Sequence, residues 1–223
     1  NDVRDFQTGI YDYNAMTSAF VRLDSKDPIG HPTKISFSMQ EWCGHVWDQW
    51  TIDGEHWTRI GHSYFDGEAE TSASGTLGPR TLFADALPLY VRGLAGEWLA
   101  PGASGSYTLI PRAMQTRMSH SPSTPLQVTV HRSDSNRSVS VPAGSFDAEV
   151  WTISHDNKPY LTFSVEKSPP HRILSWAGVD GNTAALTGTT RLKYWQKARE
   201  GDEVLRTQLG LPVPTKTQKS GAQ

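Results

Sequence analysis

Apolar and polar residues alternate along most of this chain, and such a two-residue period is typical of β-strands with one buried face. The alternation is clearest in the second half of the chain, where short polar turns separate the segments. Strands at this spacing favour an antiparallel meander that curls into an open or closed barrel. The segments predicted as strands are 34–39, 40–52, 55–65, 106–110, 126–132, 138–141, 146–154, 160–166, 172–179 and 183–195.

The strongest local signal is a β-hairpin between residues 40 and 65, rich in tryptophan and histidine. Its turn is predicted at Asp53-Gly54, because a type I′ turn needs positive φ at both central residues and Asp-Gly suits both positions. This turn fixes the cross-strand pairs of the hairpin. The predicted pairs are Ile52 with Glu55, Trp50 with Trp57, Asp48 with Arg59, and His45 with His62.

Four segments depart from the strand pattern. Residues 24–33 and 67–78 are rich in small, polar and turn-forming residues, and we predict that they are connections, the second of them mobile. Residues 81–94 predict a helix that Pro88 interrupts, and residues 200–209 predict a short second helix. No internal repeat and no parallel β-α-β pattern is evident. The predicted fold is therefore all-β: an antiparallel, strongly curved sheet or incomplete β-barrel with one or two short helices.

Length and composition limit the classes of protein to consider. The chain has 223 residues and a formal net charge of -2, so charge gives no reason to expect binding to nucleic acid. No apolar stretch is long enough to cross a bilayer as a helix, and a single cysteine excludes an internal disulfide. We predict a single β-rich domain over 1–211 and a flexible tail over 212–223. Since patterned sequence starts at Asn1 without a methionine, we expect that a native N-terminal portion is missing.

One face of the predicted hairpin gathers residue types that bind metals. Cys43 and His45 alternate on one strand and His62 lies opposite, so the three side chains can surround one tetrahedral ion. Thiolate and imidazole suit zinc, and Glu41 and Asp66 would supply a further carboxylate or a general base. In the alternative interpretation, Cys43 is a small buried residue and the histidines form an ordinary cross-strand pair. We therefore expect no cofactor, with a zinc site as the alternative.

The other candidate site in the hairpin is aromatic. The same register places four aromatic side chains on one face, where they can line an apolar cavity for a ligand. Trp47 and Ile60 lie on the opposite face, which indicates a hairpin that is buried on both sides or that closes a barrel. Core packing is the alternative interpretation, with Asp48 and Arg59 as a cross-strand ion pair. The candidate ligand-binding residues are Trp42, Trp50, Trp57 and Phe65.

Several motifs resemble a family of uncharacterised bacterial exported proteins and lipoproteins. The resemblance covers nearly the whole chain, and its most specific motif is Gln-Glu-Trp-Cys-Gly-His at 40–45. It implies a location outside the cytoplasm, in the periplasm or at the outer membrane, with any lipid anchor in the missing N-terminal portion. Some members bear the name septum formation inhibitor Maf. True Maf proteins are α/β nucleotide pyrophosphatases with a basic phosphate-binding loop, and this sequence has neither feature. The other motifs lie at 8–11, 16–18, 63–65, 191–195 and 209–211.

A second resemblance concerns the C-terminal part of the chain. Residues 142–176 are similar to exported β-rich proteins of the DUF3108 type, which look like open barrels related in shape to lipoprotein carriers. This similarity implies a curved sheet around an apolar cavity. It supplies no catalytic residues that could be assigned to positions of this chain.

Three functional hypotheses follow from these observations. The first is an extracytoplasmic binding or carrier protein whose apolar cavity holds a lipid or another hydrophobic ligand. The second is a metal-dependent hydrolase that uses Cys43, His45 and His62, with zinc as its cofactor. The third is a structural or assembly component of the cell envelope, which offers an edge strand to an envelope protein partner. The sequence favours the first hypothesis and leaves open whether the protein is an enzyme.

Overall fold

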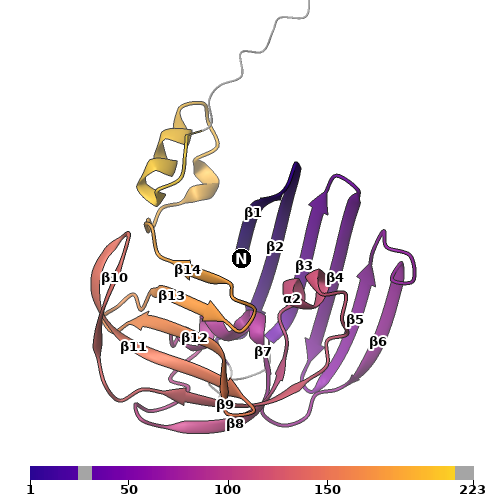
Figure 1. The fold of residues 1–223 in the computed structure, drawn as a ribbon, viewed down its shortest axis with the longest axis horizontal. Helices are drawn as coiled ribbons and strands as arrows, with labels where there is room; N and C mark the ends of the chain where they lie inside the picture. Colours follow the sequence, from indigo (N-terminus) through magenta and orange to yellow (C-terminus); the bar gives the residue numbers. More distant parts are fainter. Residues whose placement is uncertain (25–31, 214–223) are drawn as a thin grey trace, which may run out of the picture.

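The protein is all-β and contains two curved sheets (Figure 1). The computed structural model describes residues 1–24 and 32–213. The first sheet has six strands in chain order, and each strand pairs antiparallel with the next. Its strands are β1 (Asp2–Thr8), β2 (Tyr11–Val21), β3 (Pro32–Glu41), β4 (Gly44–Asp53), β5 (His56–His62) and β6 (Glu70–Thr76).

The second sheet has eight strands, in the order β14-β13-β12-β11-β9-β8-β7, and β10 pairs with β11 beside this path. The parallel pair β7–β8 is joined through the 3-10 turn η1 (Ala84–Ala86) and the short helix α1 (Leu87–Tyr90). The strands are β7 (Thr81–Phe83), β8 (Ser104–Ile110), β9 (Leu126–Arg132), β10 (Arg137–Val141), β11 (Gly144–His155), β12 (Lys158–Glu166), β13 (Ile173–Gly178) and β14 (Thr183–Ala185).

One hydrophobic core joins the two sheets. It contains Ile35 and Trp50 from the first sheet, Val130 and Phe163 from the second, and Tyr90 at the end of α1. The α1 segment therefore lies between the sheets, where apolar residues on the inner face of each sheet bury it. This shared core fixes the position of each sheet relative to the other.

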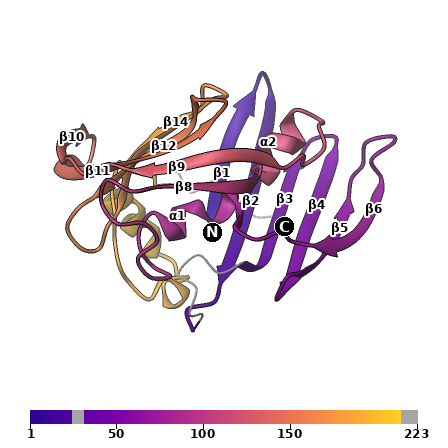
Figure 2. The ribbon, with the colours of Figure 1, turned by 90° about the horizontal axis from the view of Figure 1, so that it is seen from below.

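A second short helix, α2 (Ala113–Met118), packs on the first sheet (Figures 1 and 2). Its residues Ala113 and Met114 contact a smaller buried cluster that includes Phe37, Met39 and Val46 of β3 and β4. After β14 the chain leaves the sheets and forms the projection seen in yellow in Figure 1. This projection contains the 3-10 helices η2 (Tyr194–Gln196) and η3 (Asp202–Leu209).

Several sequence predictions of single elements are wrong. Residues 67–78, predicted as a mobile connection, contain the strand β6, whose residues are all exposed and therefore lack an apolar alternation. Residues 81–94 begin with β7, and Pro88 lies in the first turn of α1, where the missing N–H costs little. The β7–α1–β8 segment is a parallel crossover that the sequence did not predict. Of residues 183–195, only the first three belong to a strand.

Two predictions lie wholly or largely outside the described part of the chain. The predicted loop at 24–33 coincides with residues 25–31, and the predicted flexible tail coincides with residues 214–223. Within residues 1–24 and 32–213, no helix is long and apolar enough to cross a membrane.

Candidate functional site

The β4–β5 hairpin has a register that differs by two residues from the predicted one. Asp53 pairs with His56, so the turn is Gly54-Glu55, and His62 lies opposite Trp47 in place of His45. Gly54 has φ of +60°, which glycine adopts without steric cost. A shift of two residues keeps every side chain on its predicted face, because strand side chains alternate with a period of two.

The predicted metal ligands lie on the outside of the first sheet. His45 and His62 are exposed, and their ring centroids are 6.0 Å apart. Cys43 belongs to the tight turn between β3 and β4, where its backbone N–H donates to the Glu41 carboxylate at 2.7 Å. In the part of the chain that the structure describes, no group of three His, Cys, Asp or Glu side chains is arranged to hold a metal ion. These residues therefore do not fit the zinc site of the alternative hypothesis.

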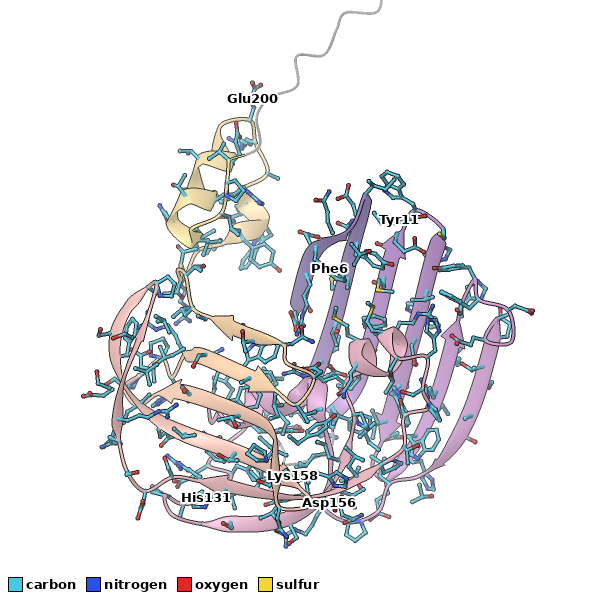
Figure 3. The ribbon with its side chains drawn as sticks, in the orientation of Figure 1. Phe6, Tyr11, His131, Asp156, Lys158 and Glu200 are labelled. Atoms are coloured by element: carbon cyan, nitrogen blue, oxygen red, sulfur yellow. The ribbon has the colours of Figure 1, made fainter. Side chains whose placement is uncertain are left out.

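The four predicted aromatic residues do not form one surface. Trp50 and Trp57 pack against each other at 4.7 Å between ring centroids, and both belong to the shared core or contact it. Trp42 is exposed at a hairpin turn beside Tyr11, at the tip of the first sheet (Figure 3). Phe65 lies in the loop after β5, where its ring contacts Tyr64 of that loop, Arg117 of α2 and His120 just after α2.

The predicted ion pair between Asp48 and Arg59 is present. The Arg59 Nε donates to the Asp48 carboxylate at 3.0 Å, and the guanidinium lies 5.2 Å from the centroid of the Trp50 ring. The pair is diagonal, since Arg59 lies opposite Trp50 and Asp48 lies opposite Gly61. Both charged groups therefore face the interior between the first sheet and α2.

A cleft of about 320 Å³ opens between α2 and the inner face of the first sheet, and we call it the α2 cleft. The Asp48–Arg59 pair lies on its wall. His62 also borders the cleft, although its exposed ring pairs with Glu70 on the outer face of the sheet. Its other lining residues include Phe37, Glu68, Thr71, Arg117, His120 and Ser121.

Three charged or polar side chains of the α2 cleft form one network. His120 Nδ1 lies 3.0 Å from Glu68 Oε1, and Arg117 donates to the other carboxylate oxygen of Glu68. These hydrogen bonds hold the pKa of Glu68 below its usual value, with His120 making the larger contribution. The Arg117 guanidinium stacks on Phe65 at 4.2 Å from the ring centroid, and the Phe65 ring also contacts His120. Phe65 thus supports the network.

A second cleft, of about 410 Å³, lies between β2, α1 and β13, and we call it the arginine cleft. Three arginines line it, and apolar side chains from both sheets and from α1 form much of the rest of its wall. Its lining residues include Ala19, Pro88, Leu89, Ile173 and Leu186, with Asp2, Asp85, Arg92, Arg112 and Arg172 as charged side chains.

Arg112 is the most unusual of the three arginines. Its guanidinium lies 4.5 Å from the centroid of the Trp176 ring, and burial lowers its pKa below the usual value. Among residues 1–24 and 32–213, no acceptor forms a hydrogen bond with the Arg112 side chain and no carboxylate lies within ion-pair distance of it. The guanidinium carries five N–H donors, and none of its nitrogen atoms is fully buried, so these donors remain accessible from the cleft.

The other charged groups of the arginine cleft have partners within the protein. Arg172 forms a two-pronged ion pair with Glu166, and Arg92 donates to the backbone carbonyl oxygens of Pro170 and His171. Asp85 accepts a hydrogen bond from a backbone N–H, and burial raises its pKa to about 6. The guanidinium of Arg112 is therefore the group of this cleft that is best placed to receive an anion.

The chain was compared with protein-family models, with curated proteins and with solved structures, and it matches none of them. The family resemblance drawn from the motifs thus stays a prediction.

Neither cleft was predicted from the sequence. Glu68 and His120 are 52 residues apart, and no spacing rule connects them. Arg112 lies between Pro111 and Ala113, and this local sequence does not show that its guanidinium is buried. Arg112 comes shortly after Leu109 and Ile110, two apolar residues at the end of β8, and this is only a weak indication that it is buried.

Proposed function

We propose that this protein binds a small amphipathic anion in the arginine cleft, with a carboxylate on Arg112 and an apolar body against the surrounding side chains. The proposal keeps the binding-protein hypothesis from the sequence and changes its ligand. A purely hydrophobic ligand would leave the Arg112 donors unsatisfied, whereas a carboxylate would accept from two of them at once.

The observation that carries the proposal is the unpartnered guanidinium of Arg112. Its N–H donors have no acceptor among the described residues and are accessible from the cleft, so a carboxylate can accept from them without displacing a protein partner. The guanidinium lies over the Trp176 ring, and this cation–π contact helps to hold it at the wall of the cleft. Arg92 lies on the same wall without a carboxylate partner among the described residues, and it adds positive potential to the cleft.

The apolar part of the ligand is inferred from the rest of the wall. Ala19 comes from the first sheet, Pro88 and Leu89 come from α1, and Ile173 comes from the second sheet. These side chains offer an apolar surface next to Arg112. Burial of an alkyl chain there contributes about 0.8 kcal/mol for each methylene group.

The experiment compares two probes of equal chain length by isothermal titration calorimetry at pH 7, octanoate and 1-octanol. We expect the wild-type protein to bind octanoate at least tenfold more tightly, since a charge-assisted hydrogen bond is worth about 1.5 to 3 kcal/mol. Arg112→Gln should lower the octanoate affinity by about tenfold or more and leave the 1-octanol affinity unchanged.

Arg4→Gln is the matched control. Arg4 also lies over the Trp176 ring, at 5.2 Å from its centroid, but it is paired with Asp2. This variant should bind octanoate like the wild type. Equal affinity of the wild type for both probes, or an equal loss in Arg4→Gln and Arg112→Gln, would contradict the proposed function.

We further propose, from the two resemblances, that the protein acts outside the cytoplasm as a carrier of this ligand. Cell fractionation of the full-length protein with an osmotic-shock step tests the location. Recovery of the protein in the cytoplasmic fraction would contradict this part of the proposal and leave the binding site untouched.

A further inference from the structure

His120 occupies a backbone position that usually belongs to glycine. It directly follows Ser119, the C-cap residue of α2, and its φ is +48°. The His120 N–H donates to the carbonyl oxygen of Arg117, and the Ser121 N–H donates to that of Thr116. This pair of hydrogen bonds is the Schellman motif, whose left-handed residue is most often glycine because a side chain is strained there. A strained residue of this kind is an observation from which a functional role can be inferred.

The imidazole of His120 is held in one orientation. A carboxylate only accepts hydrogen bonds, so His120 Nδ1 carries the proton that is donated to Glu68 Oε1 at 3.0 Å. In the neutral ring the other nitrogen, Nε2, then has a free lone pair. His120 lines the α2 cleft, so this lone pair belongs to a residue that a ligand in the cleft contacts.

Glu68 is itself fixed before any ligand binds. Arg117 donates to its second carboxylate oxygen, and the Arg117 side chain is only 10% exposed. Phe65 supports both partners of Glu68, because its ring lies against the Arg117 guanidinium and against the His120 ring. Arg117 is therefore a positioning residue, which holds the carboxylate that orients the imidazole. An imidazole oriented by a carboxylate is the arrangement that enzymes use for general-base catalysis.

We propose that Glu68 and His120 form a general-base pair that hydrolyses small carboxylic esters in the α2 cleft. Water attacks the ester carbonyl carbon while His120 Nε2 takes a proton from this water. The tetrahedral intermediate then expels the alcohol oxygen, which takes the proton back from His120. An ester and a water molecule thus give a carboxylic acid and an alcohol, and no metal or redox partner takes part.

The size and the polarity of the cleft define the substrate class. A volume of about 320 Å³ suits a short acyl group, and the Asp48–Arg59 pair on the wall favours an ester with polar oxygen atoms over a long alkyl chain. Thr71 and Ser121, which carry hydroxyl groups, also line the cleft. This site is separate from the arginine cleft, so the proposal does not depend on the proposed binding function.

The experiment measures hydrolysis of 4-nitrophenyl acetate by the full chain, with more than ten turnovers for each protein molecule. We expect saturable hydrolysis at least 100-fold faster than that by an equal concentration of 4-methylimidazole. General-base catalysis typically contributes about 100-fold to 10,000-fold, so His120→Gln should lose at least 100-fold of this rate. A wild-type rate equal to that of 4-methylimidazole would overturn the proposal.

Glu68→Gln tests whether hydrolysis requires the imidazole to be oriented by the carboxylate or only to be present. The carboxylate holds the imidazole in one orientation, so its loss should lower kcat by about tenfold and leave KM unchanged. The control is His131→Gln: this histidine lies on the second sheet (Figure 3) and interacts with the Ser104 hydroxyl. It should hydrolyse the ester at the wild-type rate.

His120→Gly tests whether the histidine is there for structure or for chemistry. Glycine relieves the left-handed strain, so this variant should melt at the wild-type temperature or above it and still lose the ester hydrolysis. Retained hydrolysis in the folded His120→Gly protein would overturn the proposal. A lower melting temperature would also count against it, because the histidine would then serve the stability of the loop.

Discussion

The carboxylate of Asp85 accepts a hydrogen bond from the backbone N–H of Ala113 at 3.0 Å. This bond ties η1, between the two sheets, to the first residue of α2. Asp85 thereby lies on the wall of the arginine cleft, close enough to Arg112 for the guanidinium to stabilise its charge. Burial is the larger effect, and it raises the pKa of Asp85 to about 6.

The raised pKa of Asp85 predicts a pH-dependent stability. The usual value is 3.8, so between about pH 4 and pH 6 the folded protein holds a proton that the unfolded chain releases. The stability from protonated Asp85 is complete below pH 4 and is lost as the pH rises through 6. Asp85→Asn keeps a side-chain acceptor for Ala113 and cannot ionise. We expect it to be more stable than the wild type at pH 8, by on the order of 2 to 3 kcal/mol, and equally stable at pH 4.

Urea unfolding of both proteins at pH values from 4 to 8 measures this difference. Asp156→Asn is the control, since Asp156 is exposed in the turn between β11 and β12 and has positive φ, which asparagine also tolerates (Figure 3). This control should follow the wild-type pH curve. A constant difference between Asp85→Asn and the wild type over the whole range would contradict the assignment.

Glu41 is predicted to control the reactivity of Cys43. The thiol is exposed at a hairpin turn, and the neighbouring Glu41 carboxylate raises its pKa, chiefly through a hydrogen bond. Iodoacetamide should therefore alkylate Cys43 in the native protein without denaturant, but more slowly than free cysteine. Glu41→Gln should speed the reaction about threefold or more at pH 8, because more of the thiol is then ionised.

Mass spectrometry of the alkylated protein over time gives these rates. Glu70→Gln provides the control, since Glu70, at the start of β6, pairs with His62 of β5 and does not contact Cys43. Its alkylation should match that of the wild type. A thiol that reacts only after unfolding would show that the turn is covered.

Gly188 is predicted to hold the C-terminal projection in place. A Cβ atom at this position would lie 2.7 Å from the carbonyl oxygen of Gln208 and 2.9 Å from the Cα of Leu209. Because these are backbone atoms, they cannot move aside without displacing η3. Gly188→Ala should therefore release η3, also weakening the hydrogen bond from the Thr187 hydroxyl to the Leu209 carbonyl oxygen at 3.1 Å.

Limited trypsin digestion, with the cleavage rate after Arg206 as its readout, tests this role of Gly188. We expect cleavage several-fold faster in Gly188→Ala, with an unfolding midpoint of the sheets like that of the wild type. In the control Gly78→Ala, the added Cβ lies at ordinary contact distance, 3.9 Å, from Thr81. Equal cleavage rates in all three proteins would show that η3 is not held at Gly188.

The β4–β5 hairpin shows how far the sequence determines local structure. The alternation of residues correctly placed Trp50 and Trp57 on one face and Trp47 and Ile60 on the other. The expectation of burial on both faces was wrong, because Ile60 is exposed and only the face of Trp50 and Trp57 meets the core. The turn was placed one residue too early, because Asp-Gly fits a type I′ turn better than the Gly54-Glu55 turn that forms. The free energies of the two turns differ only slightly. Contacts between the hairpin and its neighbouring strands can outweigh this difference and so decide the register.

The strand β6 illustrates a different limit. Its residues are small and polar and all of them are exposed, so its sequence resembles a connection. It forms a strand because β5 offers a row of backbone hydrogen-bonding groups on which it pairs from Glu70 to Thr76. This pairing depends on the neighbouring strand, so the polarity of the β6 side chains does not predict it.

By itself, the sequence determined the all-β class, most strand positions in the second sheet and the faces of the central hairpin, because alternation over a few residues is a local property. The tertiary structure alone decided which distant residues meet. Glu68 reaches His120, and Asp85 reaches Ala113, only after α2 packs on the first sheet. The burial of Arg112 likewise depends on both sheets at once. Both clefts arise from packing between elements far apart in the chain, and local sequence patterns do not predict such packing.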